Sequence, residues 1–184
     1  MMREIRDSDE VIRCREVARR VAAADVSPVP AWLSGSHAGI IPVEPRSWHD
    51  RAEPIAGVLR QLGVRSAIAV LMGDGAGLAP PCLELEAGDP AELAAASWRY
   101  AMVDWAGFVA TGIPESTWAL FSTEWYELWA GPPQLVEAVA GGTHEHACAE
   151  FLRYACSFTR SSDLRAHLQG VYRRYCGETP APTG

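Results

Sequence analysis

The chain has 184 residues, of which 48% are hydrophobic and 21% charged, a composition typical of a globular domain with a substantial core. Its net charge of −7 argues against nucleic-acid binding, because a protein that binds the phosphate backbone needs a basic surface. The N-terminal residues are charged and no apolar run is as long as a membrane span. We therefore expect neither a secretory signal nor membrane insertion, and a cytoplasmic location.

The basic residues indicate the type of source organism, and the cysteines indicate whether a metal or disulfide framework is present. All sixteen basic residues are arginine, which indicates the biased coding of a high-GC bacterial source. The five cysteines are odd in number, widely spaced and without a C-x-x-C pair, so they predict neither a zinc ribbon nor a disulfide framework. We expect the chain to fold without metal, cofactor or disulfide, with most cysteines buried as small apolar residues.

The first half of the chain is predicted to alternate regular and irregular segments. Residues 5–24 have a helical apolar stripe that begins after Asp7. Residues 26–50 are rich in proline and glycine but also contain Trp32 and Trp48, which predicts a long ordered loop. This loop is either a lid over a binding site or a strap whose tryptophans fill the core.

A helix and a hairpin are expected next. Residues 51–62 form the helix, which ends at Gly63. Two apolar runs, 64–72 and 82–86, are separated by a glycine-rich segment and predict a β-hairpin. The glycine-rich segment lacks the lysine of a phosphate-binding loop.

The clearest helix start in the chain is Asp89-Pro90, with Glu92 completing the capping pattern. We expect this helix to run to about residue 110. Its buried stripe is predicted to contain Ala94, Trp98, Met102 and Trp105. Three more helices are expected at 133–140, 144–158 and 163–175, and the tail at 177–184 is expected to be disordered.

Residues 117–130 contain three of the seven tryptophans and have two interpretations. As a hairpin, the two halves are strands rich in aromatic residues. As a helix, Trp118, Phe121, Trp125 and Leu128 recur at steps of three and four. We favour the hairpin because of its aromatic density.

On the second strand of this hairpin, alternate residues face opposite sides. We assign the less polar row, Tyr126, Leu128 and Ala130, to the core. The other row then becomes a binding surface, and Glu127 in it is either a solvated glutamate or a carboxylate in an aromatic pocket, where burial would raise its pKa. The whole predicted surface consists of Trp32, Trp48, Trp118, Trp125, Glu127 and Trp129.

Few residues are arranged for chemistry. If the protein is an enzyme, Glu127, Asp104 or His144 is its acid–base group. His144 and Cys148 lie one helical turn apart and could be two ligands of one metal, but a site needs three or four ligands and no spacing supplies the others.

These elements predict an α+β fold with one domain over residues 1–176, in which helices cover an antiparallel sheet of about four strands in two hairpins. The order of elements over 51–140 resembles the roadblock and profilin-like layouts, and this resemblance implies no site residues.

Two functions fit the sequence. The first is a cytosolic protein that binds a basic protein partner through an aromatic and acidic surface, for example an inhibitor or immunity-type protein. The second is a small-molecule enzyme, or a protein that binds a small hydrophobic ligand, with a pocket lined by Trp118, Trp125 and Trp129 and covered by the 26–50 loop. The sequence predicts no oligomeric state.

Overall fold

An antiparallel sheet of seven strands organises the part of the chain that the structure describes. The structure is a computed structural model, and it describes residues 1–36, 39–72, 80–101, 107–113 and 117–177. The strand order is β1-β4-β3-β5-β6-β7-β2, so the two outermost strands come from the first quarter of the chain. The strands are β1 (Arg3–Ile5), β2 (Gly39–Val43), β3 (Ser66–Leu71), β4 (Cys82–Glu86), β5 (Phe108–Ile113), β6 (Ala119–Ser122) and β7 (Glu127–Gly131).

Several helices begin or end at the capping residues that the sequence predicts. Asp7 accepts hydrogen bonds from the backbone of Asp9 and Glu10, and Thr143 and Ser161 cap two later helices in the same way. Gly141 ends another helix in the left-handed conformation, with φ of 65°. The helices are α1 (Ser8–Val21), α2 (Pro30–Ser36), α3 (Ala52–Gln61), α4 (Pro90–Ala101), α5 (Pro133–Ala140), α6 (His144–Ser157) and α7 (Ser162–Cys176), with a 3-10 helix η1 at His49–Arg51.

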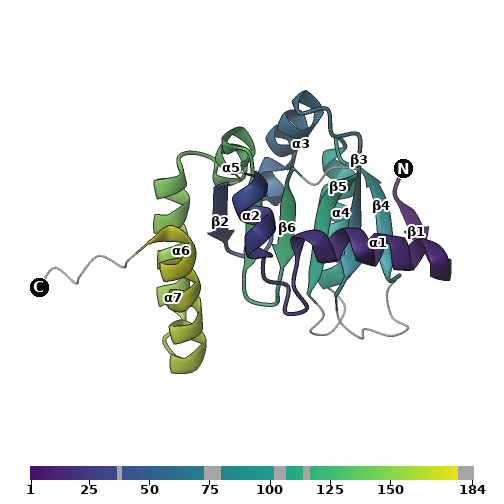
Figure 1. Cartoon of the computed structure of the whole chain (residues 1–184). Helices are drawn as coiled ribbons and strands as arrows, with labels where there is room; N and C mark the ends of the chain where they lie inside the picture. The colour runs from purple at the N-terminus through teal and green to yellow at the C-terminus, as the bar shows by residue number, and fades with distance from the viewer. Residues whose placement is uncertain (37–38, 73–79, 102–106, 114–116, 178–184) are drawn as a thin grey trace, which may run out of the picture.

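Both faces of the sheet are covered (Figure 1). Helices α3, α4 and α5 pack on one face, where they form a single hydrophobic cluster with β3 to β7. Helix α1 packs on the opposite face, over β3 and β4. Helices α6 and α7 lie together beside the β2 edge, and their apolar residues join Leu128 and Phe121 in a further cluster. The sheet is therefore the middle layer between helices, and its central strands are buried on both sides.

The predicted α+β class is confirmed, but the sheet has seven strands and not about four. Strands β1, β2 and β5 were missed. The 26–50 segment is not one long loop, because it contains α2, β2 and the start of η1. β2 pairs with β7, where Ile41 lies opposite Trp129, so this segment extends the sheet.

The helix that starts at Asp89 is shorter than predicted. α4 ends at Ala101 within the described residues, and Phe108–Ile113 is strand β5, paired with β3. The predicted stripe is also wrong at Trp98, whose side chain is 52% exposed. The buried face is instead formed by Leu93, Ala96, Ser97 and Tyr100. The hydroxyl of Tyr100 lies 3.1 Å from the carbonyl oxygens of Ala69 and Pro80, both of which can accept its hydrogen bond. Met102, Asp104 and Trp105 lie outside the described residues.

The hairpin interpretation of residues 117–130 is confirmed. β6 and β7 pair antiparallel with Phe121 opposite Leu128 and Ser122 opposite Glu127. Within the described part of the chain, no helix combines the length and the apolar character needed to cross a membrane.

Candidate functional site

Glu127 opens β7 and is almost completely buried, with 1% of its surface exposed. Its Oε2 accepts hydrogen bonds from the indole Nε1–H of Trp48, at 2.6 Å, and from the backbone N–H of Arg46, at 3.1 Å. Its Oε1 accepts one from the hydroxyl of Ser122 at 3.1 Å. Two of these donors lie in the segment after β2, so the carboxylate fixes that segment against the β6–β7 hairpin.

Burial raises the pKa of Glu127, while the hydrogen bonds from Arg46, Trp48 and Ser122 oppose the increase. Of the two interpretations of Glu127, the solvated glutamate is wrong, because the side chain is buried. Its aromatic surroundings are a closed core and not a ligand pocket. A substrate would reach this carboxylate only if the segment after β2 moved away. We interpret Glu127 as an anchor of that segment, which makes it a poor candidate for an acid–base catalyst.

Most of the predicted binding surface lies in the core. Trp48, Trp118 and Trp129 are each 0% exposed. The ring of Trp129 stacks on Trp118 at a centroid distance of 5.9 Å and meets Trp48 edge to face at 5.1 Å. The prediction that Glu127 and Trp129 face outward is wrong, because the helices α3 and α5 cover their side of the sheet while α6 and α7 cover the side of Leu128.

The other two residues of the predicted surface differ in exposure. Trp32 is half-buried and packs edge to face on Phe121 at 6.0 Å. Trp125 is 37% exposed, at the turn between β6 and β7. Trp125 is thus the member of the predicted set that is available at the surface.

Trp125 belongs to a group of three aromatic residues that we call the aromatic patch: Trp125, Tyr154 and Phe158. The rings of Trp125 and Phe158 are perpendicular at 6.2 Å, and those of Tyr154 and Phe158 are perpendicular at 5.2 Å. The hydroxyl of Tyr154 donates a hydrogen bond of 2.8 Å to the carbonyl oxygen of Trp125. The C-terminal end of α6 therefore holds the β6–β7 turn in place.

The turn that carries Trp125 is also braced from within. The backbone N–H of Thr123 donates to the carbonyl oxygen of Tyr126 at 3.0 Å, and the Thr123 hydroxyl donates to the same oxygen at 2.7 Å. The backbone N–H of Tyr126 donates to the Thr123 hydroxyl oxygen at 3.1 Å. None of residues 123–126 has a positive φ, so this turn does not require the glycine or asparagine of a tight hairpin turn.

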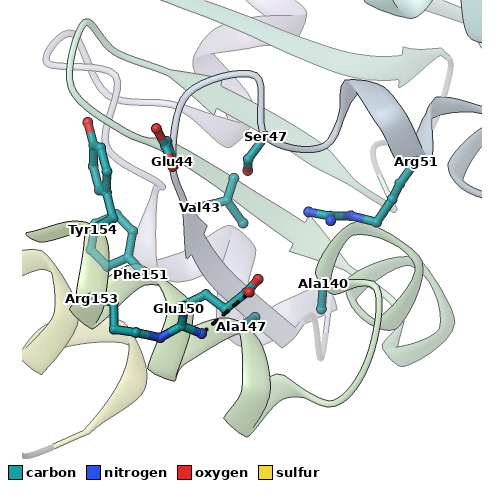
Figure 2. A pocket seen from close by; sticks show the side chains of 10 residues that line it. All are labelled: Val43, Glu44, Ser47, Arg51, Ala140, Ala147, Glu150, Phe151, Arg153 and Tyr154. Atoms are coloured by element: carbon teal, nitrogen blue, oxygen red, sulfur yellow. Dashed lines mark hydrogen bonds and ion pairs between the residues drawn. The ribbon is translucent and has the colours of Figure 1, made fainter.

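A pocket of about 310 Å³ adjoins the aromatic patch (Figure 2). It lies between the segment after β2, the end of α5 and one side of α6, so we call it the α5–α6 pocket. Its six polar lining residues are Glu44, Ser47, Arg51, Glu150, Arg153 and Tyr154. Four apolar residues complete the lining: Val43, Ala140, Ala147 and Phe151. Tyr154 belongs to both the pocket and the patch.

The catalytic candidates are not brought together at this pocket. The Nε2 atom of His144 is 3.1 Å from the carbonyl oxygen of Ile40, so the ring is positioned to donate to the sheet edge at β2. Glu127 is in the core, and Asp104 lies outside the described residues. The Trp-lined pocket under a 26–50 lid does not form, because Trp118 and Trp129 pack against each other.

The metal hypothesis also changes. His144 and Cys148 are adjacent as predicted, with 3.7 Å between Nδ1 and Sγ. Cys148, however, forms a disulfide with Cys176 that links α6 to α7, so its sulfur is not free to bind a metal as a thiolate. The described residues contain no group of three or more histidine, cysteine or acidic side chains placed to hold a metal ion. The expectation that the cysteines form no disulfide is wrong for this pair.

Comparison with known proteins adds no assignment: no family model, no curated protein and no solved structure matches the chain.

Sequence reasoning missed Tyr154, Arg51 and Glu44. One signal for Tyr154 was present, since Tyr154 and Phe158 are four residues apart on a predicted helix and must share a side of it. Arg51 and Glu44 reach the pocket through pairing between distant segments, which no local pattern shows.

Proposed function

We propose that this protein binds a basic protein partner through the aromatic patch and the acidic residues beside it. The observation that carries the proposal is the 37% exposure of Trp125, a large apolar side chain held at the surface by contacts with α6. Tryptophan and tyrosine are enriched among the residues that dominate the energy of protein interfaces. A cluster of both at one end of a hairpin fits such an interface.

The patch is already ordered before any partner binds. Phe158 fixes the Trp125 ring and Tyr154 fixes its backbone, so little side-chain freedom would be lost on association. Preordered side chains raise affinity because the entropy cost of binding is lower. This order supports a docking role.

Charge supports a basic partner. The whole chain carries a net charge of −7, and the exposed residues Glu44 and Glu124 lie beside the patch. Burial, followed by the negative charge of Glu44, raises the pKa of Tyr154 to about 12, while the positive charge of Arg46 opposes the increase. Acidic residues around an aromatic centre accelerate association with a basic protein and select against acidic ones.

An inhibitor or immunity-type protein is the kind of binding protein that this surface fits best, because such proteins bind with preformed surfaces. The Cys148–Cys176 disulfide bears on location, since these bonds persist mainly in oxidising compartments. The disulfide therefore favours an oxidising compartment over the cytoplasmic location that we expect from the sequence. The enzyme alternative is not retained, because its Trp-lined pocket does not form.

Site-specific photo-cross-linking tests the proposal. A photoreactive phenylalanine at position 125, in the native host, should capture one main protein with a basic isoelectric point, identified by mass spectrometry. The same group at position 12 is the matched control, since Ile12 is 54% exposed on α1, a helix that packs over β3 and β4 and not over β7. Equal capture at the two positions, no capture at 125, or capture of an acidic protein would contradict the proposal.

A further inference from the structure

We propose that the α5–α6 pocket binds a small zwitterion, recognising the carboxylate and the ammonium group of a free α-amino acid. This inference does not depend on the protein partner proposed above. It rests on opposite charges that enter one pocket from different walls, as Figure 2 shows for the side chains of Arg51 and Glu150.

Arg51 forms the cationic wall and is held in place. Its Nε–H donates a hydrogen bond of 2.7 Å to the carbonyl oxygen of Val139, near the end of α5. Gly141 leaves room for the side chain, because a Cβ atom at that position would lie 2.9 Å from Cδ of Arg51. The terminal N–H groups point into the pocket in Figure 2, where they can bind a carboxylate through two hydrogen bonds.

Two glutamates supply the acidic groups from different sides of the pocket, Glu44 from the segment after β2 and Glu150 from α6 (Figure 2). Among the described residues, Glu44 has no ion pair. Glu150 has only long contacts with exposed basic side chains, at 3.4 Å to Arg153 and 3.6 Å to His146. Exposed pairs of this kind contribute little energy, so both carboxylates can accept hydrogen bonds from an ammonium group.

The remaining lining sets the size of the ligand. Ser47 directs its hydroxyl into the pocket and can donate to a carboxylate oxygen. Ala140 and Ala147 are small, and their short side chains help leave the volume of about 310 Å³. This volume is at the lower end of the range for small-molecule sites, which suits a ligand of amino-acid size.

Charge balance separates a zwitterion from simpler ligands. Arg51 and Arg153 supply two positive charges, and Glu44 and Glu150 supply two negative ones. A lone carboxylate would meet Arg51 but be repelled by the glutamates, and a lone ammonium ion would meet the glutamates but be repelled by Arg51. A ligand with both charges pairs each of them with the opposite sign.

Isothermal titration calorimetry with matched ligands tests this inference. L-leucine is compared with 4-methylpentanoate, which lacks its ammonium group, and with 3-methylbutylamine, which lacks its carboxylate; glycine, L-lysine and L-glutamate complete the panel. We expect saturable binding of at least one amino acid. For the leucine set, we expect binding at least about tenfold tighter than that of either single-charge analogue, because each analogue loses charge-assisted hydrogen bonds.

Variants locate the binding. Glu150→Gln and Arg51→Gln should each weaken amino-acid binding about tenfold or more, whereas Glu145→Gln, at an exposed α6 position outside the pocket, should leave it unchanged. Glu150→Gln keeps the inference testable if Arg51→Gln unfolds the protein. Equal binding of 3-methylbutylamine would overturn the inference and indicate a pocket for a basic side chain. Absence of saturable binding up to about 10 mM for the whole panel would also overturn it.

Discussion

Trp48 donates its indole hydrogen bond to the buried carboxylate of Glu127 across 2.6 Å, joining two residues separated by 79 positions in the sequence. The bond fixes the segment after β2 on the β6–β7 hairpin. The same segment carries Glu44, Ser47 and Arg51 to the pocket. A contact in the core thus positions one wall of the α5–α6 pocket.

The pH dependence of stability tests the state of Glu127. Its pKa is raised above the ordinary value of 4.5, so above that pH the unfolded chain loses this proton before the folded protein does. Wild-type stability should therefore decline, relative to Glu127→Gln, as the pH rises from about 4.5 towards the folded-state pKa. Urea unfolding of both proteins between pH 4 and about pH 8 measures the difference. A stability difference that stays constant over this range would contradict a raised pKa.

Removal of the carboxylate should be costly. Glu127→Ala leaves the Trp48 indole and the Arg46 backbone N–H without their acceptor, and each unsatisfied buried donor costs about 1–3 kcal/mol. We expect the free energy of unfolding to fall by about 2–6 kcal/mol in total. Glu124→Ala is the control, at an exposed position of the β6–β7 turn. It should change the free energy of unfolding by less than about 0.5 kcal/mol.

Burial on both sides of β7 has its own test. Trp129→Ala should cost about 3–5 kcal/mol and Leu128→Ala about 2–5 kcal/mol, because these neighbours face opposite sides of the sheet and both are buried. Trp125→Ala should cost much less, since Trp125 is partly exposed. Denaturant unfolding of the three variants compares them. If the Trp129→Ala variant were as stable as the wild type, the Trp129 side chain could not be buried in the core.

Local sequence patterns predict most helices of this fold, but they do not predict which faces of β7 are buried. The caps at Asp89, Thr143 and Gly141 are local signals, and the elements they bound are found. Exposure of β7 depends on the helices that cover its two faces, α3 and α5 on one side and α6 and α7 on the other, and no local pattern shows that packing. Pro42 occupies the edge strand β2, where a missing N–H is tolerated.

The missed strand β5 shows a related limit. The run at 107–113 is short and follows a strong helix start, so the predicted helix was extended into it, to about residue 110. Their pairing with β3 and β6 is long-range, and only the assembled sheet reveals it. Within the site, Trp125 alone of the predicted row stays at the surface, because it precedes β7 in the turn.

The disulfide should contribute to stability. Cys148 and Cys176 are 28 residues apart, and closing a loop of that length stabilises a fold by about 3–4 kcal/mol in the chain-entropy model. We expect a reducing agent to lower the urea midpoint of the wild type, and to have no effect on a Cys148→Ser, Cys176→Ser variant. Cys156→Ser, at an exposed free cysteine, should respond like the wild type. An unchanged midpoint of the wild type on reduction would show that the bond does not contribute.

The dissociation constant for the partner captured at position 125 tests the central claim most directly. It should be measured by calorimetry for the wild type, Trp125→Ala and Ile12→Ala. The two variants each remove an exposed apolar side chain, one at the β6–β7 turn and one on α1, which packs over β3 and β4. The account predicts that Trp125→Ala weakens binding by about tenfold or more and that Ile12→Ala changes it less than about twofold. Equal affinities of the wild type and Trp125→Ala would contradict a docking role for the aromatic patch.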